Sequence, residues 1–577
     1  MKKASLWILT ILMIVSNLSA ADFYVSANAS GNGNGSLNSP WKLQEAMSSP
    51  LALMNPVDTV WIWILEGNYT NNFDSQTSFN CFTNGKPNAP IIFRNYKNQK
   101  VVIDGDLPYT IYFAFGNCSY TWLWGLEILN SSTKDRDHSN IDRLGNIACL
   151  AENIKFINLI VHDLGSGLDL WKTSKNSESY GCIIYNIGNN LSNNGNWEGH
   201  GHGMYLQNDT FGVKNIHDNI IFNAFGYGVK VWQTTTASAL GNFDIQRNIV
   251  FNSGAPSENL GGVGNNYRTH NFFVVTNGQN NPVKNTVIKH NLTYSGTNTP
   301  RPPVNAFGLN FGVKNMTLDS NVLTGQLRLG YNNTPVFDAT VQGNTIVAGI
   351  PTAYGYYLWG FLEADFIQNT YIPTPLATGL EYFIYPNKYE AGRSHLAVYN
   401  WDGDASVAVD ISESGLQSGD IFELVNVMDY HNDIITDTLS SSGIIAVNMQ
   451  DHSFSEVIGS QKNSVSQFPF FGAFVIRKIG ETSTTGISEI KNNTQLNIFP
   501  NPTSNGYKLS FLIARSGFYD VTLTDIVGKT TLIQRKAYFD TGNQEIQMDP
   551  KDLENGIYFI RIEGQQSVFN GKLVLNK

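Results

Sequence analysis

The sequence predicts an all-β solenoid, in which the chain winds into stacked coils of short strands. The main observation is a motif in which Asn follows a polar residue or glycine and precedes a β-branched or apolar run. It recurs at Asn219, Asn248, Asn291, Asn321 and Asn344, at intervals of 29, 43, 30 and 23 residues. Unequal intervals above a minimum are typical of coils that carry surface loops of different lengths.

The recurring asparagine also predicts how the coils are held together. Neighbouring strands of a sheet lie about 4.8 Å apart, so the same Asn would recur directly above itself from coil to coil. Its amide could then hydrogen-bond up and down the stack, which satisfies polar atoms at a tight corner. We therefore expect a ladder of inward-facing asparagines.

Composition supports a large, turn-rich β protein. Charged residues make up only 15% of the chain and aromatics 12%, and there are 52 glycines, a balance that argues against a disordered chain. A length of 577 residues predicts several domains. The net charge of -10 argues against nucleic acid or an anionic membrane as a partner, because both require an excess of Lys and Arg. A polyanionic glycan would need a local basic patch.

The first segment of the chain predicts export. Lys2 and Lys3 precede an apolar run over residues 6–15, and small residues follow at 18–21. This is the pattern of a signal peptide, which we place at residues 1–20. The apolar run is too short to span a bilayer, and no later segment is long and apolar enough to do so. We therefore expect no transmembrane segment.

The next segment resembles a known family of exported proteins. The sequence DFYVS at residues 22–26, Ser39-Pro40-Trp41, VVIDG at residues 101–105 and the Asn motifs resemble right-handed parallel β-helix proteins, the family of pectate lyases and chondroitinase B-type enzymes. The resemblance covers residues 22 to about 350 and implies a β-helix, which we place at residues 22–370. That scaffold hosts lyases, hydrolases, epimerases and adhesins, so it implies a fold and leaves the reaction open.

Two further units are expected after the β-helix. Residues 375–479 alternate apolar and polar positions between Gly and Asp turns, which predicts a β-sandwich accessory domain. Tyr399 and Trp401 could bind sugar there, although a role as core residues that brace the helix is the preferred interpretation. The composition of residues 480–494 predicts a linker.

The C-terminal segment resembles a second family. The sequence LNIFPNP at residues 496–502, with the runs at 519–529 and 553–558, strongly resembles the C-terminal sorting domain of the type IX secretion system of Bacteroidetes. The resemblance implies a small β-sandwich over residues 495–577 that is recognised by the secretion machinery. It also implies a protein that is secreted or anchored at the cell surface. A sandwich that binds a ligand and stays attached is the alternative.

The four cysteines, Cys81, Cys118, Cys149 and Cys182, are even in number, and an exported protein could pair them. Cys149 and Cys182, however, lie in apolar, strand-like runs. A thiol in such a run usually serves as a small core residue. We therefore favour free cysteines over disulfides.

The functional surface is predicted from strand periodicity. The sequences GLDLW at residues 167–171, GMYLQ at 203–207 and GVKVW at 228–232 repeat one alternating pattern. Alternate side chains of a strand point to opposite faces. If the aliphatic residues are buried, Asp169, Tyr205 and Lys230 face outward as one column. Trp171, Gln207 and Trp232 then form the neighbouring column, where indoles could bind sugar rings or be covered by loops.

A histidine-rich segment lies beside this column. The sequence EGHGHG at residues 198–203 combines imidazoles, which exchange protons near neutral pH, with glycines that allow close approach of a substrate. Strict alternation would point His202 inward with Met204. Either the strand begins only at Gly203 or this histidine is a core residue. A single Gly-His-Gly also occurs in polygalacturonases, but their companion Asp motifs are missing here.

Two reactions fit these residues. β-Elimination of a uronate requires a cation for the carboxylate, a base for the C5 proton and an acid for the leaving oxygen. Lys230 with Arg247 and Arg268 could supply the charge and the base, and Tyr205, His200 or His202 the base or acid. Hydrolysis requires two carboxylates, for which Asp169 with Glu198 or Asp163 is available. Ca²⁺ held by such oxygens could replace the arginines, although no dense string of acidic ligands marks a site.

The favoured prediction is an exported polysaccharide lyase that acts on a uronate-containing glycan as a monomer. A glycoside hydrolase on the same scaffold and a non-catalytic glycan-binding or adhesive protein are the alternatives. Pairing of Asp169 with Lys230 would explain both charges without any function. The catalytic candidates are Lys230, Tyr205, His200, His202 and Asp169. The candidates for substrate binding are Trp171, Gln207, Trp232, Glu198, Arg247, Tyr267 and Arg268.

Overall fold

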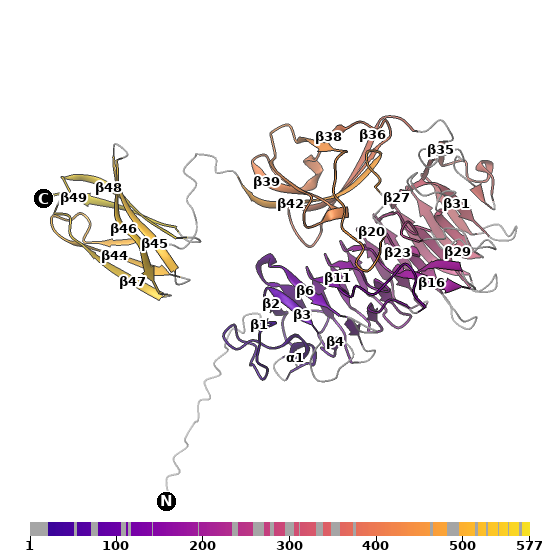
Figure 1. Ribbon diagram of the computed structural model, residues 1–577, viewed down its shortest axis with the longest axis horizontal. Helices are drawn as coiled ribbons and strands as arrows, with labels where there is room; N and C mark the ends of the chain where they lie inside the picture. The colour runs from indigo at the N-terminus through magenta and orange to yellow at the C-terminus, as the bar shows by residue number, and fades with distance from the viewer. Residues whose placement is uncertain are drawn as a thin grey trace, which may run out of the picture. The chain divides into compact units, whose positions relative to one another are not determined.

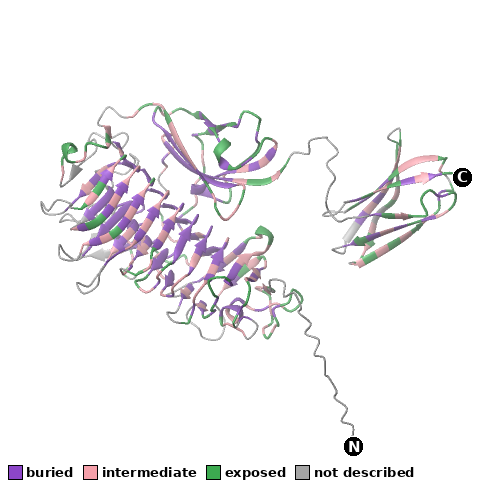
Figure 2. Cartoon of the chain, turned by 180° about the vertical axis from the view of Figure 1, so that it is seen from behind, coloured by how far each residue is buried: buried purple, intermediate pink, exposed green. Residues whose placement is uncertain are grey.

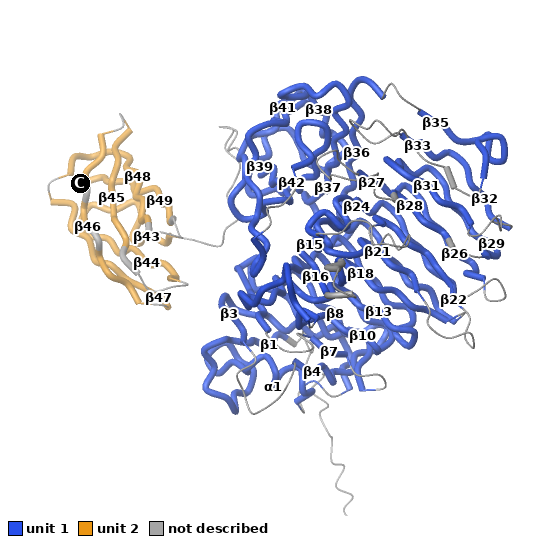
Figure 3. The backbone as a smooth tube through the Cα atoms, turned by 45° about the vertical axis from the view of Figure 1, so that its right-hand side comes forward, with its two compact units in different colours: residues 1–482 blue, residues 483–577 orange. Residues whose placement is uncertain are grey.

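The chain forms two compact units, residues 1–482 and residues 483–577, shown in different colours in Figure 3. The computed structural model describes residues 21–50, 53, 55–70, 79–105, 111–113, 117–140, 142–193, 196–209, 211–232, 240–257, 270–276, 282–294, 305–310, 312–330, 338–347, 358–359, 361–372, 377–461, 466–481, 496–513, 517–526, 529–540, 542–551, 553–564 and 568–577. The predicted signal peptide and most of the predicted linker lie outside these residues. No helix among the described residues is long and apolar enough to cross a membrane.

The first unit contains a right-handed parallel β-helix, as predicted (Figure 1). Its strands form three long parallel sheets, and each coil adds a strand to each sheet in turn. We name the sheets by their first strands.

The β1 sheet contains β1 (Ala21–Val25), β2 (Val60–Ile64), β5 (Ile91–Asn95), β8 (Thr121–Trp124), β11 (Lys155–Ile157), β14 (Glu178–Tyr180), β19 (Lys214–His217), β22 (Leu240–Gly241), β23 (Phe243–Gln246), β26 (Val283–Lys289), β29 (Val313–Asp319) and β32 (Ala339–Gln342). The β3 sheet contains β3 (Gly67–Thr70), β6 (Val101–Asp104), β9 (Glu127–Leu129), β12 (Ile160–His162), β15 (Ile183–Tyr185), β20 (Ile220–Phe222), β24 (Ile249–Phe251), β27 (Leu292–Tyr294), β30 (Val322–Thr324), β33 (Thr345–Val347) and β35 (Thr370–Ile372).

The β4 sheet contains β4 (Phe79–Cys81), β7 (Ile111–Phe113), β10 (Ile147–Cys149), β13 (Leu168–Leu170), β18 (His202–Leu206), β21 (Tyr227–Trp232), β25 (Phe272–Val275), β28 (Asn305–Asn310), β31 (Gln326–Leu329) and β34 (Leu358–Trp359). Outside the three sheets lie the helix α1 (Leu43–Met47), the 3-10 turns η2 (Tyr96–Asn98) and η3 (Glu363–Asp365), and a hairpin of β16 (Asn189–Asn193) and β17 (Asn196–His200).

The predicted asparagine ladder is confirmed at the corner between the β1 and β3 sheets. Each side-chain Nδ2 donates to the Oδ1 of the next asparagine, over distances of 2.9 Å from Asn219 to Asn248, 2.9 Å from Asn248 to Asn291, 3.0 Å from Asn291 to Asn321 and 2.8 Å from Asn321 to Asn344. Asn369 continues the ladder by one coil at 2.8 Å. The same Oδ1 atoms also accept a hydrogen bond from the backbone N–H of the neighbouring asparagine. Each of these Oδ1 atoms therefore accepts two hydrogen bonds from the preceding coil.

The residue before each ladder asparagine has a left-handed backbone. The φ values are 57° at Asp218, 53° at Arg247, 54° at His290, 56° at Ser320 and 64° at Gly343. This region is unfavourable for side chains other than Gly, Asn and Asp, because Cβ crowds the backbone. The hydrogen-bonded ladder therefore compensates for a sharp bend that the chain repeats in each coil.

The interior of the β-helix is filled by the aliphatic side chains that periodicity predicted. Leu168, Leu170, Met204, Leu206, Val229 and Val231 are all buried in one continuous core. Figure 2 shows buried residues along the full length of the three sheets. The four cysteines are buried free thiols, with the Sγ atoms of Cys81 and Cys118 3.6 Å apart.

The accessory domain is a β-sandwich that packs on the outer face of the β3 sheet. Its five-stranded sheet contains β36 (Leu380–Pro386), β37 (Arg393–Asn400), β42 (Phe471–Glu481), β39 (Asp420–Asn426) and β40 (Ile434–Thr438), and its second sheet pairs β38 (Ser406–Asp410) with β41 (Ile444–Asn448). Two 3-10 turns, η4 (Ser412–Ser414) and η5 (Val427–Asp429), join its strands. β42 extends to Glu481, which is two residues into the predicted linker.

Aromatic stacking holds the sandwich to the β-helix. Tyr294 of β27 stacks on Phe471 of β42 with ring centroids 4.8 Å apart, and Tyr399 Oη donates to the Thr293 carbonyl at 3.0 Å. Tyr399 and Trp401 are buried in this contact, which confirms that they are core residues. The accessory domain therefore braces the helix, and every residue of β37 is buried between two cores.

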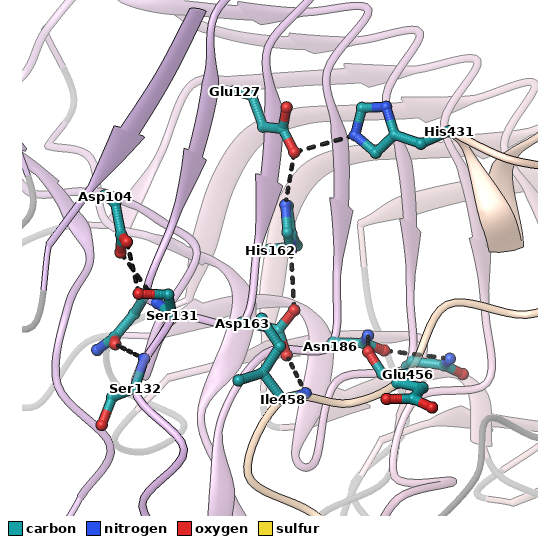
Figure 4. Close-up of polar contacts among 12 residues, drawn as sticks. Asp104, Glu127, Ser131, Ser132, His162, Asp163, Asn186, His431, Glu456 and Ile458 are labelled. Atoms are coloured by element: carbon teal, nitrogen blue, oxygen red, sulfur yellow. Dashed lines mark hydrogen bonds and ion pairs between the residues drawn. The ribbon is translucent and has the colours of Figure 1, made fainter. Parts of the chain in front are cut away.

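A buried charged cluster forms the other part of this junction (Figure 4). His162 of β12 lies 2.8 Å from Asp163 Oδ2 through Nδ1 and 3.1 Å from Glu127 Oε1 through Nε2. His431 of the sandwich reaches the same Glu127 oxygen at 2.9 Å. Asp163 Oδ1 accepts a hydrogen bond from the backbone N–H of Ile458 at 3.0 Å. The cluster therefore ties two sandwich segments to the β3 sheet.

The second unit is a small β-sandwich with its own core. Its three-stranded sheet contains β43 (Asn497–Phe499), β44 (Tyr507–Ile513) and β47 (Gly542–Met548), and its four-stranded sheet contains β46 (Thr530–Phe539), β45 (Gly517–Asp525), β48 (Gly556–Gly564) and β49 (Val568–Leu575). Leu509, Val521, Ile562 and Leu573 are among its buried residues. This agrees with the sandwich that the C-terminal resemblance implies.

Asn291→Ala should destabilise the first unit by about 1–3 kcal/mol, because it leaves buried ladder partners unsatisfied. Asn291 donates to the Ile245 and Lys289 carbonyls and to Asn321, and its loss removes all three contacts. Urea unfolding followed by circular dichroism measures the change. Asn28→Ala, at an exposed position, is the control and should leave the midpoint unchanged. Equal midpoints for both variants would contradict the role of the ladder.

The His162 cluster should make stability depend on pH. Burial lowers the pKa of His162, but hydrogen bonds to Asp163 and Glu127 outweigh it and raise the pKa from 6.5 to about 9. The folded-state pKa therefore exceeds the unfolded value, so the stabilisation is complete below pH 6.5 and is lost as the pH rises through 9. His162→Gln should cost on the order of 2 kcal/mol at low pH and much less at high pH. Urea midpoints of both proteins at pH 6 and pH 9.5 test this, and a difference that stays constant with pH would contradict it.

Candidate functional site

The predicted column of outward side chains is formed on the β4 sheet. Strand register places Asp169 of β13 opposite Tyr205 of β18, and Tyr205 opposite Lys230 of β21. The flanking aliphatic residues point into the core, so these three positions project to the other side of the sheet. We call the outer side of β13, β18 and β21 the candidate face.

Tyr205 is at the centre of the candidate face. Its ring lies 5.4 Å from the Trp171 ring and stacks on His202 at 5.7 Å, and its hydroxyl accepts a hydrogen bond from Gln207 Nε2 at 2.9 Å. Burial raises the pKa of Tyr205 above its ordinary value of 10, so the side chain is a neutral phenol at physiological pH. It can therefore donate a proton or a hydrogen bond to a substrate oxygen.

Lys230 lies one coil further along. Its Nζ is 4.8 Å from the centroid of the Tyr227 ring and 4.8 Å from that of Trp232. Cation–π contacts of this kind hold an ammonium group in place without neutralising its charge. Lys230 thus brings a positive charge to the coil next to Tyr205.

The histidine segment departs from strict strand alternation. β18 begins at His202, yet this side chain is not buried with Met204 and instead contacts Tyr205 and Tyr227, at 5.7 and 5.4 Å. His202 is therefore not the core residue that one of the two interpretations allowed, although the strand does not begin at Gly203 either. The glycines on either side let the backbone turn the ring outward. His200, at the end of β17, is half-exposed and its Nδ1 lies 2.6 Å from Asp142 Oδ1.

Asp169 occupies the column but is shielded from solvent. It is only 5% exposed, and its carboxylate accepts hydrogen bonds from Ser166 Oγ, at 2.6 Å, and from Asn146 Nδ2. Burial raises the pKa of Asp169 to about 6, and the hydrogen bonds from Ser166 and Asn146 only partly oppose this. The expectation of an outward, accessible carboxylate is thus corrected, because two polar side chains cover it.

The two predicted tryptophans line the edge of the face. Trp171 follows β13 and is 37% exposed, while Trp232 at the end of β21 is half-buried. Neither indole points into the core. Under this edge, buried Lys214 donates from Nζ to the Trp171 carbonyl at 2.7 Å and to the Gln207 carbonyl. Burial lowers the pKa of Lys214 to about 7.

Sequence reasoning missed several residues that extend the face. Phe273 of β25 pairs with Lys230, and Arg328 of β31 lies two coils beyond Phe273 in the same column. His270 contacts both Tyr227, at 5.6 Å, and Phe273, at 4.5 Å. Burial, with Arg328 and Lys230 nearby, lowers the pKa of His270 to about 3, so it is neutral. The alternating sequence of β31 could have placed Arg328 in the column.

Five other predicted residues are not part of the described face. Arg247 lies at the asparagine corner, where Nε and Nη2 bind Asp218 at 2.8 and 2.7 Å, so it is not on the candidate face as expected. Tyr267, Arg268 and the side chain of Glu198 lie outside the described residues. Asp163, the other candidate carboxylate, is buried in the junction with the sandwich.

The described residues contain no group of three His, Cys, Asp or Glu side chains arranged to hold a metal ion. The groups that the structure does bring together are a phenol, an imidazole and an ammonium on adjacent coils, with a guanidinium further along. Such a set can bind an anion and transfer protons.

Comparison with known proteins identifies the C-terminal unit. Residues 497–576 match the secretion system C-terminal sorting domain family. No curated protein sequence matches the chain. Among solved structures, the chain is similar to pectate lyase Pel9A, with 15% identity, a TM-score of 0.38 and coverage of 59% of this chain and 78% of that one.

A second similar structure is an alginate lyase from Paenibacillus sp. str. FPU-7, with 19% identity, a TM-score of 0.32 and coverage of 61% of this chain and 99% of that one. The sorting domain at residues 497–576 shows where the protein acts. The protein is secreted or attached to the cell surface, and its main body is a right-handed parallel β-helix.

Proposed function

We propose that the protein is a polysaccharide lyase that cleaves an extracellular, uronate-containing glycan by β-elimination on the candidate face. The observation that carries this proposal is the alignment of Tyr205 and Lys230 on adjacent coils, with His202 stacked on the tyrosine. These side chains supply a proton donor, a positive charge and a proton acceptor within one sugar-sized area. Elimination requires these three functions.

The positive charge on the candidate face serves to neutralise the substrate carboxylate. A uronate loses its C5 proton only when the adjacent carboxylate is neutralised, because the developing negative charge spreads onto it. Lys230 lies in the middle of the column, and Arg328 lies three coils along the same column. Burial, together with the charges of Arg328 and Lys230, lowers the pKa of His270, so this histidine adds no positive charge of its own.

The remaining roles are assigned to His202 and Tyr205, whose rings stack on the candidate face. His202 takes the C5 proton as the base, and the electrons of that C–H bond form the C4–C5 double bond. The bond from C4 to the leaving oxygen breaks at the same time, and the oxygen takes a proton from the Tyr205 phenol. Because the pKa of Tyr205 is raised, the phenol stays protonated until the leaving oxygen takes its proton. The products are a saturated reducing end and an unsaturated non-reducing end.

The aromatic edge would position the sugars. Trp171 is 37% exposed and contacts Tyr205, so its indole can receive the apolar face of a pyranose beside the reacting sugar. Trp232 contacts Lys230, and its indole can receive a sugar ring in the same manner. Lys214 holds the backbone of this edge from below.

One observation favours a glycoside hydrolase as the second candidate. Burial raises the pKa of Asp169 to about 6, so this carboxyl is partly protonated near neutral pH, as a general acid must be. Asp142, which is paired with His200, could act as the second carboxylate. In this scheme Asp169 and Asp142 are essential, and Lys230 is not.

The first prediction for this face separates the reactions. Full-length protein incubated with algal and plant polysaccharides should release unsaturated ends that absorb ultraviolet light. Lys230→Ala should lower turnover about a hundredfold or more, because the substrate carboxylate keeps its charge. Trp232→Ala should mainly raise KM, because it removes a binding surface. Lys314→Gln, which removes an exposed charge on β29, is the matched control.

Saturated ends alone would support the hydrolase, and retention of polysaccharide without cleavage would support a glycan-binding protein. If lyase activity is present but insensitive to both Lys230→Ala and Trp232→Ala, the candidate face is wrong.

The second prediction concerns Asp169. Asp169→Asn keeps the size of the side chain and its contacts with Ser166, so a lyase of the proposed type should keep its turnover within about threefold. A hydrolase that uses Asp169 as its acid should lose about a hundredfold or more in kcat. Initial rates of both proteins on the cleaved polysaccharide distinguish the two. A large loss with unsaturated products would show that Asp169 takes part in the elimination and would contradict the assignment of Tyr205 as the acid.

A further inference from the structure

A cleft of about 580 Å³ lies between the β-helix and the accessory sandwich. The helix contributes residues such as Arg94 of β5 and Trp124 of β8, and the sandwich contributes residues such as Arg393 of β37 and Arg477 of β42. Its volume falls in the range of about 300–1,000 Å³ that is typical of small-molecule sites. The cleft shares no residue with the candidate face, which is on the β4 sheet.

The cleft is cationic in a chain that is acidic overall. Its charged lining consists of Arg94, Lys100, Arg393, Arg477 and Lys478 against Glu127, Glu390 and Glu423. Lys100 pairs with Glu127, Arg477 with Glu423, and Lys478 with Asp420 and Glu481, so the excess positive charge comes from Arg94 and Arg393. The whole chain has 37 Lys and Arg against 47 Asp and Glu. A local excess of positive charge is what a polyanionic ligand requires on such a protein.

Protein partners already engage the carboxylates of the lining. Glu127 contacts His162, His431 and Lys100. Glu423 is held by Arg477 Nε, and Glu390 accepts a hydrogen bond from Asn158 Nδ2 at 2.9 Å. Burial lowers the pKa of Arg94, and the charge of Glu390 only partly opposes this. Tyr430 and Glu390 raise the pKa of Arg393 against its burial.

Arg393 and Arg477 are direct cross-strand neighbours in the pair of β37 and β42. Like charges in this position repel one another. Arg393 is buried, and no acceptor within the described part of the chain reaches its Nε atom. A buried donor of this kind costs free energy unless a ligand satisfies it. A carboxylate bound in the cleft beside the two arginines would screen the repulsion.

An aromatic surface leads out of the cleft. The Arg94 guanidinium lies 3.9 Å from the centroid of the Trp124 ring, and Trp61 lies 6.3 Å from Trp124. Trp61 and Trp63 are half-exposed on the outer side of β2, with rings 5.2 Å apart and inclined by only 7°. Flat indole surfaces of this kind receive the apolar faces of sugar rings. The anion site and the aromatic surface are therefore continuous.

We propose that this cleft is a second carbohydrate-binding site, which holds a carboxylate-bearing sugar of an acidic polysaccharide between Arg94, Arg393 and Arg477. The neighbouring sugars of the same chain lie along Trp61 and Trp63. The site holds the polymer on the protein while the candidate face works on another part of it. This inference rests on the proposed function for the identity of the ligand as an acidic glycan.

The test uses full-length protein that carries Lys230→Ala, so that no turnover disturbs the measurement. Isothermal titration with tri-galacturonate should detect binding, and adding Arg94→Gln or Arg477→Gln should weaken one binding event about tenfold or more. Lys314→Gln is the control for loss of one charge elsewhere in the β-helix. Circular dichroism establishes that each variant is folded, and the two cleft variants serve as independent checks on each other.

The outcomes separate this site from the candidate face. If Arg94→Gln and Arg477→Gln bind tri-galacturonate with the affinity of the parent protein, the cleft proposal is overturned. This holds even where Trp232→Ala weakens binding. If the event that depends on Arg94 persists when Trp232 is replaced, the cleft proposal stands whatever the candidate face does. If neutral cellotriose binds equally well at the site that depends on Arg94, the assignment of an anionic sugar is overturned. Sodium sulfate that binds there while tri-galacturonate does not would show a free-anion site and overturn it too.

Discussion

The hydrogen-bonded stack of asparagines at one corner of the coil is the constraint on which the rest of the structure depends. Each ladder asparagine follows a residue with a left-handed backbone, even where that residue is Arg247, His290 or Ser320. The strain recurs in coil after coil, and a buried amide chain compensates for it in each one. Asn219 also binds Ser179 and the Cys182 backbone N–H, so the ladder reaches the coil of Tyr205. Strand pairing in the β4 sheet then aligns Asp169, Tyr205 and Lys230.

The three sheets have different surroundings, and this decides where function can reside. The sandwich covers the β3 sheet with aromatic contacts such as Tyr294 on Phe471, so its outer side is a second core. The β4 sheet presents Tyr205, Lys230 and Trp171 to the medium. The cationic cleft forms where the edge of the sandwich meets the first coils. The accessory domain therefore covers one sheet and, at its edge, forms one wall of the cationic cleft.

Periodicity predicted the fold and the column well, because both depend on alternation and on the spacing of Asn219, Asn248 and the later repeats. It failed for Arg247 and Asp169, whose positions depend on contacts distant in sequence: Arg247 pairs with Asp218, and Asn146 and Ser166 cover Asp169. Alternation alone left the orientation of His202 open, since flexible glycines lie on both sides of it. The cleft could not have been predicted, because its arginines come from separate domains whose packing no local pattern encodes.

The most direct test of the central claim is a crystal structure of the Lys230→Ala protein with a uronate oligosaccharide. The aligned register predicts a sugar carboxylate at the position vacated by the Lys230 ammonium group, with its leaving oxygen next to the Tyr205 hydroxyl and a ring on Trp171. An oligosaccharide bound to another sheet, with the outer side of β13, β18 and β21 left empty, would contradict the account.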